Sequence, residues 1–129
     1  DELEKQMINY LKEKLILLQN KNVTDGERIL AEIQRYVPHH LQEPLTIGSL
    51  ADMFHLNPVY LGKIVKKSTG HSLATLVCQC RIAEAKRLLK NTSLSVLQIS
   101  KQVGFQDASY FAKKFKEQEK ILPTEYRGD

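Results

Sequence analysis

One pattern of apolar and polar residues occurs twice in this chain, and the repeat constrains the fold more than any other feature. Residues 47–56 and 96–105 carry apolar side chains at matching positions, with an offset of 49. Residues 57–66 and 107–116 match with an offset of 50, because Gln106 adds one residue to the second copy. Two core patterns that agree in this way predict a duplicated packing unit. The matched pairs are Ile47/Val96, Leu50/Ile99, Phe54/Val103, Leu56/Phe105, Asn57/Asp107, Tyr60/Tyr110, Leu61/Phe111, Lys63/Lys113, Val65/Phe115 and Lys66/Lys116.

Each copy is predicted to form two short helices joined by a turn, because its apolar residues recur at helical spacing. Gly104 can adopt the left-handed conformation that a sharp turn between helices needs, and Asp107 is a good N-cap for the helix after it. In the first copy His55–Leu56 form the turn, Asn57 caps the second helix and Pro58 takes its favoured first position. We expect the second helices to bury Tyr60, Leu61, Ile64 and Val65 in the first copy, and Tyr110, Phe111 and Phe115 in the second.

A single long helix, residues 72–90, is predicted between the copies. Its apolar residues lie on more than one side, which is typical of a helix buried from two directions. At ~1.5 Å per residue it would span about 28 Å, which is close to the ~34 Å between successive major grooves on one face of B-DNA. One chain could therefore set two helices in neighbouring grooves without a dimer.

The N-terminal part precedes the repeat. Residues 3–20 are predicted to form an amphipathic helix, which would be marginal alone and must dock on the domain, pair with another copy or continue from a preceding segment. Thr24 and Glu27 form a capping box that opens a helix from Asp25, and Pro38 should end it. Because the chain starts without an initiator Met, we expect a fragment of a longer protein. The stripe of the first helix is Leu3, Met7, Tyr10, Leu11, Leu15 and Leu18.

The sequence thus predicts an all-α fold, in which two helix-turn-helix subdomains are joined by a long linking helix and preceded by an N-terminal amphipathic helix. We divide it into an N-terminal arm, residues 1–23, and a domain, residues 24–129. Within the domain we expect the first helix-turn-helix at about 46–68, the linking helix at about 72–90 and the second helix-turn-helix at about 95–118.

Charge also divides the chain. Residues 1–56 hold six Lys/Arg against nine Asp/Glu, a net charge of −3, and residues 57–129 hold thirteen against six, a net charge of +7. This asymmetry is expected if only the second part meets a polyanion such as nucleic acid. A solvated, lysine-rich surface is the alternative interpretation.

Several other classes of function lack support in the sequence. No apolar run approaches the ~18 residues of a membrane span. Cys78 and Cys80 lie two apart on a predicted helix, hence on different faces, so they neither pair nor share a metal; we interpret them as buried small hydrophobes in a reducing cytosol. Neither a zinc-type ligand spacing nor a nucleophile–base pair is present. We therefore expect a cytoplasmic protein with no catalytic site, metal or cofactor.

Four stretches of the chain form a long, ordered motif: LADMFHLNPVYLGKIVKKSTG, RIAEAKRLL, ISKQVGFQDASYFAKKFK and LPTEYR. Residues 45–127, which contain them, resemble the DNA-binding domain of AraC/XylS-type transcription regulators. The resemblance implies sequence-specific binding of double-stranded DNA that regulates transcription, with both second helices in adjacent major grooves. It assigns base reading to Val59, Gly62 and Lys63 in the first copy, and to Ala108, Ser109, Ala112 and Lys113 in the second. It assigns contacts with the DNA backbone to Asn57, Lys66, Lys67, the helical turn that begins at Asp107, and Lys116.

Three positions depart from the family pattern. Lys120 stands where the family usually has Gly, which bears on the turn before Pro123. Ser100 replaces a usual Ala, and Val65 replaces a usual Phe, which thins the core of the first copy.

Two further questions stay open from the sequence. An amphipathic helix followed by this type of domain resembles the C-terminal output end of a YesN-type response regulator, whose receiver would lie upstream; an upstream metabolite-binding sensor is the alternative. The main alternative to DNA binding is a protein-interaction module of a larger regulator, which would contact RNA polymerase or form a homodimer through residues 3–18.

Overall fold

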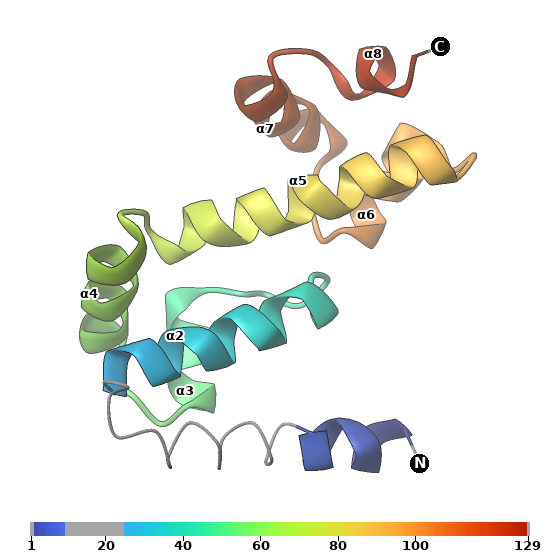
Figure 1. The fold of residues 1–129 in the computed structure, drawn as a ribbon. Coiled ribbons are helices and arrows are strands. Elements are labelled where there is room, and N and C mark those ends of the chain that lie inside the picture. Colours follow the sequence, from blue (N-terminus) through green and yellow to red (C-terminus); the bar gives the residue numbers. More distant parts are fainter. Residues whose placement is uncertain (1, 10–24, 129) are drawn as a thin grey trace.

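The computed structural model describes residues 2–9 and 25–128, and all regular structure within them is helical (Figure 1). This confirms the predicted all-α class. Of the predicted helix at 3–20, residues 2–9 are helical, and the rest, like the Thr24 cap, lies outside the described residues. The other elements are α2 (Asp25–Tyr36), the 3₁₀ helix η1 (Val37–His39), α3 (Ile47–Met53), α4 (Pro58–Thr69), α5 (Leu73–Asn91), α6 (Val96–Gln102), α7 (Ala108–Glu119) and α8 (Pro123–Arg127).

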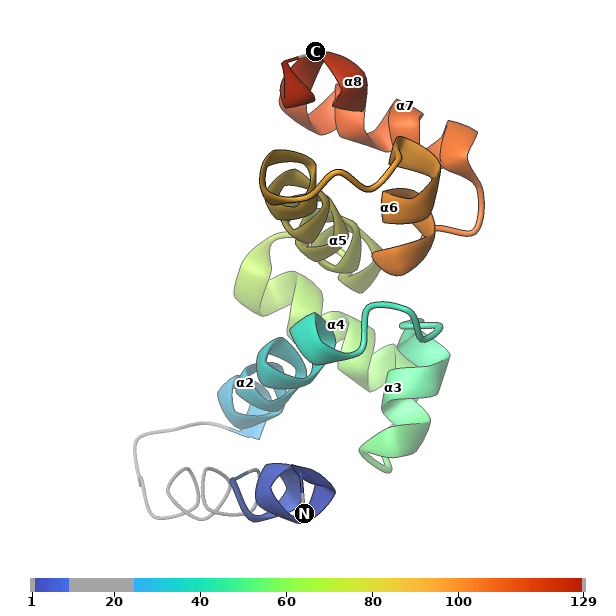
Figure 2. The ribbon, with the colours of Figure 1, turned by 90° about the vertical axis from the view of Figure 1, so that its right-hand side faces the viewer.

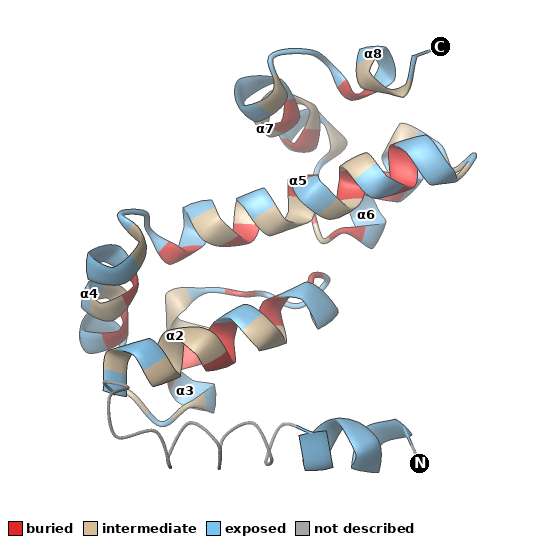
Figure 3. Cartoon of the chain, viewed as in Figure 1, coloured by how far each residue is buried: buried red, intermediate tan, exposed pale blue. Residues whose placement is uncertain are grey.

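Helix α5 runs between two groups of helices, which we call the first unit (α2, η1, α3 and α4) and the second unit (α6, α7 and α8). Figures 1 and 2 show α2 and α3 on one side of α5 and α7 and α8 on the other, with α6 alongside α5. Its N-terminal half packs into the core of the first unit through Leu73 and Val77, and its C-terminal half into that of the second through residues such as Ile82 and Leu89. Buried positions consequently occur along the length of α5 (Figure 3). The predicted burial of this helix from two directions is confirmed.

The two cysteines illustrate this division. Cys80 packs against the core of the first unit and Cys78 against that of the second, so they lie on different faces as predicted. Both thiols are free. They are half-buried rather than buried, and burial raises the pKa of each thiol.

The repeat extends to the residues that start the helices. Ser95 and Gln98 form the predicted capping box of α6, and Thr46 and Ser49 form one at the corresponding positions of α3. Asn57 accepts from the amides of Val59 (2.8 Å) and Tyr60 (3.2 Å), and Asp107 accepts from the amide of Ser109 (2.8 Å), as predicted. Side-chain caps satisfy donors that every helix N-terminus leaves unpaired, so local sequence sets these boundaries.

The turns repeat as well. Within each helix-turn-helix the turn contains a residue of positive φ, His55 at 56° and Gly104 at 104°. After each second helix the capping residue is left-handed, Gly70 at 79° and Lys120 at 73°. The turn before Pro123 therefore keeps its geometry although Lys120 replaces the glycine, and a non-glycine residue in this conformation carries a cost of roughly 1 kcal/mol.

We expect Lys120→Gly to stabilise the protein by about 1 kcal/mol, because glycine adopts this conformation without a Cβ penalty. Loss of the Lys120 Nζ bond to the carbonyl of Glu117 (3.2 Å, exposed) would offset little of this gain. Urea denaturation measures the change. Gly70→Lys is the matched control and should destabilise by a similar amount; equal stability of both variants and the parent would contradict the prediction.

The other two departures from the family pattern are accommodated in the cores. The side chain of Ser100 is fully buried, and its hydroxyl donates to the carbonyl of Leu97 at 2.8 Å, so no polar group is left unpaired. Val65 is as completely buried as its counterpart Phe115. The first core is thus built with a smaller side chain at this position.

The prediction that Tyr60 and Tyr110 are buried was wrong. The exposed fraction of the residue surface is 48% for Tyr60 and 50% for Tyr110. Adjacent residues of a helix point about 100° apart, and Leu61 and Phe111, which are fully buried, occupy the core-facing direction. Apolar spacing alone could not decide which member of each pair faces the core. Sequence analysis also missed two core residues outside the repeat, Leu41 and Leu45.

Candidate nucleic-acid interface

The residues predicted to contact DNA lie on the solvent-facing sides of α4 and α7 or cap the N-termini of these helices. None of these twelve residues is buried. The exposed ones are Asn57, Val59, Lys63, Lys66, Lys67, Asp107, Ser109, Lys113 and Lys116, and the half-buried ones are Gly62, Ala108 and Ala112.

The predicted contact lysines differ from their neighbours in their ion pairing. Lys114 lies 3.4 Å from a carboxylate oxygen of Glu117, and Lys86 lies 2.8 Å from one of Glu119; a hydrogen bond to the carboxylate raises the pKa of each lysine. Within the described part of the chain, the contact lysines form no ion pair, so their charges face solvent uncompensated. They are Lys63, Lys66, Lys67, Lys113 and Lys116.

Small residues occupy corresponding positions in the middle of both surfaces. Gly62 in α4 corresponds to Ala112 in α7, and a Cβ added at Gly62 would meet no atom within 4 Å. Glycine is thus not required there by packing. Its effect is to lower the surface of α4 between Val59 and Lys63, which lets another surface approach the helix closely.

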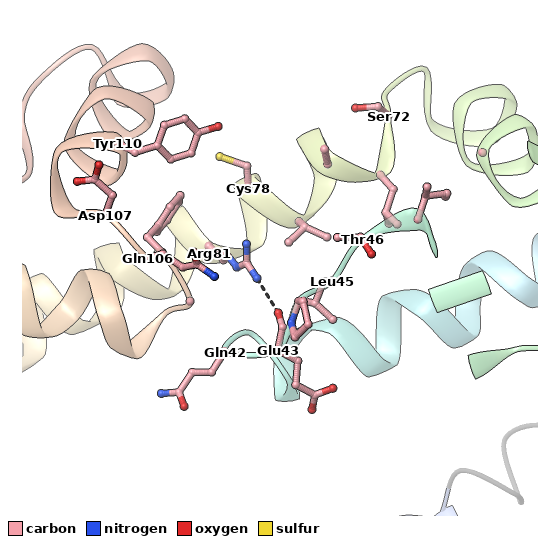
Figure 4. Close-up of a pocket in the computed structure, with 18 of the residues that line it drawn as sticks. Gln42, Glu43, Leu45, Thr46, Ser72, Cys78, Arg81, Gln106, Asp107 and Tyr110 are labelled. Carbon is pink, nitrogen blue, oxygen red and sulfur yellow. Dashed lines mark hydrogen bonds between the residues drawn. The ribbon is translucent and has the colours of Figure 1, made fainter. Parts of the chain in front are cut away.

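Both surfaces border one groove, which runs along α5 between the two units (Figure 4). It has a volume of about 990 Å³. Gly62 and Lys66 line it from α4, and Asp107 and Tyr110 line it from α7. The Tyr110 ring points along α5 towards Cys78 in Figure 4 and packs against Phe105, with ring centroids 6.1 Å apart. Helices α4 and α7 are therefore arranged around a common concave face.

No group of three or more His, Cys, Asp or Glu in residues 2–9 and 25–128 is placed to hold a metal ion. No helix in the described ranges has both the length and the apolar character needed to cross a membrane.

Residues 50–129 match the protein family described as "Helix-turn-helix domain". The chain is 37% identical over 101 residues to the uncharacterized HTH-type transcriptional regulator YisR of Bacillus subtilis (strain 168), covering 78% of this chain and 35% of the relative. This chain thus spans about a third of that protein's length.

Solved structures agree with this match. The C-terminal domain of AraT, a response regulator from Geobacillus stearothermophilus, superposes with a TM-score of 0.75 at 30% identity, covering 81% of this chain and 87% of that domain. The C-terminal domain of the two-component response regulator yesN from Fusobacterium nucleatum gives 0.72 at 33% identity, covering 76% of this chain and 96% of that domain. The chain belongs to the AraC family of helix-turn-helix, DNA-binding transcription regulators.

Proposed function

We propose that α4 and α7 are recognition helices that enter successive major grooves on one face of double-stranded DNA, with α5 spanning the interval. One observation carries this proposal: two equivalent helices, which both contribute residues to one groove along α5, carry matched exposed surfaces with uncompensated lysines. Lysines in this arrangement suit phosphates on both sides of a groove.

The side chains divide into two roles. Lys63, Lys113 and Ser109 have the hydrogen-bond donors that read base edges, and Val59 suits the methyl group of thymine. Gly62, Ala108 and Ala112 allow close approach. Contacts with the DNA backbone come from Asn57, Lys66, Lys67, Lys116 and the helical turn that follows Asp107.

We add the two exposed tyrosines to the backbone contacts. Tyr60 and Tyr110 occupy equivalent positions near the start of each recognition helix, and a phenolic hydroxyl can donate to a phosphate oxygen. The sequence offered no signal for this role, because a tyrosine within an apolar stripe is equally suited to a core.

The chain would act as the output domain of a longer, cytoplasmic regulator without catalytic activity. Residues 24–129 would bind DNA, and the arm, residues 1–23, would link them to an upstream phosphorylated receiver; a metabolite sensor is the competing upstream domain. A homodimer formed through the arm and a contact with RNA polymerase are further proposals. In the described part of the arm, Leu3 and Met7 are 73% and 65% exposed, which suits such an interface.

Selection of bound sites from a random pool of double-stranded DNA tests the proposal. Two half-motifs about one helical turn apart are expected. Affinity should also fall steeply with salt, because lysine–phosphate contacts release counterions. Recovery of no motif, together with salt-independent binding, would favour the protein-interaction module instead.

We expect Lys63→Ala to lower discrimination between the selected site and a single-base variant of its half-motif by about 1–3 kcal/mol, because Lys63 is the main polar reader of α4. Competition binding with both DNAs measures this. Lys67→Ala is the control. It should weaken binding to all DNA sequences alike, and it should reduce the slope of log affinity against log salt concentration by about 1. If Lys63→Ala weakened binding to all DNA sequences equally, Lys63 would not read bases.

A further inference from the structure

Arg81, near the middle of α5, reaches across to the segment that leads into α3, residues 40–46, which we call the entry segment. Its Nε donates to the carbonyl of Leu41 at 3.1 Å. Its Nη2 donates to the carbonyl of Glu43 at 2.9 Å, the bond dashed in Figure 4. The guanidinium is half-buried, and this burial lowers the pKa of Arg81. A forked donor on two backbone carbonyls holds the entry segment in one position relative to α5.

The turn of the second unit packs against the same place. A Cβ added at Gly104 would lie 1.9 Å from the Leu41 carbonyl oxygen and 2.7 Å from Arg81 Nε, so the backbones are in close contact there. The side-chain amide of Gln42 donates to the carbonyl of Gln102 at 3.1 Å. The Phe105 ring centroid lies 6.0 Å from the guanidinium carbon of Arg81. The entry segment therefore touches α5 and the second unit together.

The entry segment is itself anchored to the first unit through Glu43. The Tyr36 hydroxyl donates to Glu43 Oε1 at 2.6 Å, and His40 Nδ1 lies 2.5 Å from Glu43 Oε2. The rings of Tyr36 and His40 are stacked, with centroids 3.8 Å apart. Burial and the carboxylate raise the pKa of Tyr36 to about 12, so the donor hydroxyl is protonated at neutral pH. The entry segment is thus tied to the C-terminal end of α2 through Tyr36.

The second unit contains a matched arrangement without this connection. Arg127 donates through Nε to the carbonyl of Leu89 (3.1 Å), in the last turn of α5, and through Nη2 to that of Thr92 (3.3 Å), where the segment that leads into α6 begins. Thr92 corresponds to Glu43 at an offset of 49. Both arginines bind the backbone just before the first helix of a helix-turn-helix. In the first unit one of the bound carbonyls, that of Leu41, is also in close contact with the turn of the other unit at Gly104. The contacts of Arg127 lie within the second unit and the end of α5.

We propose that Arg81 is a positioning residue that fixes the distance and angle between α4 and α7, and so sets the half-site spacing that the protein accepts. The claim about half-site spacing rests on the proposed DNA-binding function. One base pair of added spacing moves a half-site by about 3.4 Å and rotates it by about 35°. A rigid pair of recognition helices cannot follow this change, whereas a pair joined only through α5 could adjust to it.

The first experiment measures the relative position of the units in the free protein. Spin labels are placed at Ser68 and Gln118, which are exposed and equivalent positions near the ends of α4 and α7, in a Cys78→Ala, Cys80→Ala background. Pulsed electron resonance should give one narrow distance distribution. Arg81→Met should at least double its width, and Arg127→Met, which removes the equivalent two bonds, should leave it unchanged. Unchanged width in Arg81→Met, or equal broadening in both variants, overturns the proposal.

Arg81→Lys is a second variant for the case that Arg81→Met does not fold, because lysine keeps the charge and has a single donor nitrogen in place of the planar fork. Circular dichroism below the unfolding transition establishes that each variant is folded. The lysine variant should broaden the distribution less than Arg81→Met but more than Arg127→Met. A distribution as narrow as that of the parent protein in the lysine variant would count against a role for the forked geometry.

The second experiment compares DNA duplexes whose two half-motifs lie at the selected spacing or one base pair further apart. The parent protein and Arg127→Met should bind the longer spacing at least tenfold more weakly, and Arg81→Met less than threefold more weakly. An unchanged tenfold preference in Arg81→Met overturns the spacing role. If the parent protein binds neither duplex, the proposed function fails, while the distance measurement still decides whether Arg81 holds the units together.

Discussion

Replacing Gly104 by alanine is expected to lower the free energy of unfolding by about 2–5 kcal/mol. Two effects add at this position. Its φ of 104° is a conformation in which a Cβ is strained, at a cost of roughly 1–2 kcal/mol. The new Cβ would also lie 1.9 Å from the Leu41 carbonyl oxygen, a backbone atom that cannot swing aside, and such overpacking costs a further 1–3 kcal/mol or so.

Gly70→Ala is the matched control for this prediction. Gly70 has a φ of 79°, but a Cβ there would meet no atom within 4 Å, so only the conformational cost of about 1 kcal/mol applies. Urea denaturation of both variants separates the destabilisation caused by the close contact from that caused by backbone strain. Equal destabilisation of the two would mean that the entry segment yields to the methyl group, and would contradict the close contact between the units.

Truncation of Phe111 to alanine is expected to cost about 3–5 kcal/mol, the usual range for a phenylalanine removed from a core. Phe111 is fully buried, and its ring lies 5.1 Å from that of Phe105 and 5.8 Å from that of Phe115, centroid to centroid. The cavity would fall within a cluster of aromatic side chains that forms the centre of the second unit. Amide hydrogen exchange should therefore accelerate most in α6 and α7.

Leu61→Ala provides the reciprocal test, because Leu61 occupies the corresponding position in α4 and is also fully buried. It should cost about 2–5 kcal/mol and accelerate exchange mainly in α3 and α4. The two cores share α5 but have separate side chains, so each variant should affect chiefly its own unit. Identical exchange patterns in both variants would show instead that the units open as one.

Local features of the fold were predictable because their causes lie within a few residues. The caps at Asn57 and Asp107 and the turn at Gly104 follow from hydrogen bonds or conformational preferences of neighbouring residues. The linking helix was predicted at 72–90 and is Leu73–Asn91. The apolar period also identifies the side of each helix that faces the core, and the contact residues that the family resemblance implies lie away from it.

The sequence by itself thus determined the helices of the repeat and the linking helix, with their approximate boundaries, the duplication and the family. Tertiary structure decided which of two adjacent residues faces a core, as at Tyr60 and Tyr110, and how the two units are held together. The bonds of Arg81 to the carbonyls of residues 41 and 43 join positions 40 and 38 residues apart, and that of Gln42 to Gln102 joins positions 60 apart. Backbone carbonyls are present at every residue, so no local pattern marks the few that a distant side chain will reach; only the packed chain brings them within hydrogen-bonding distance.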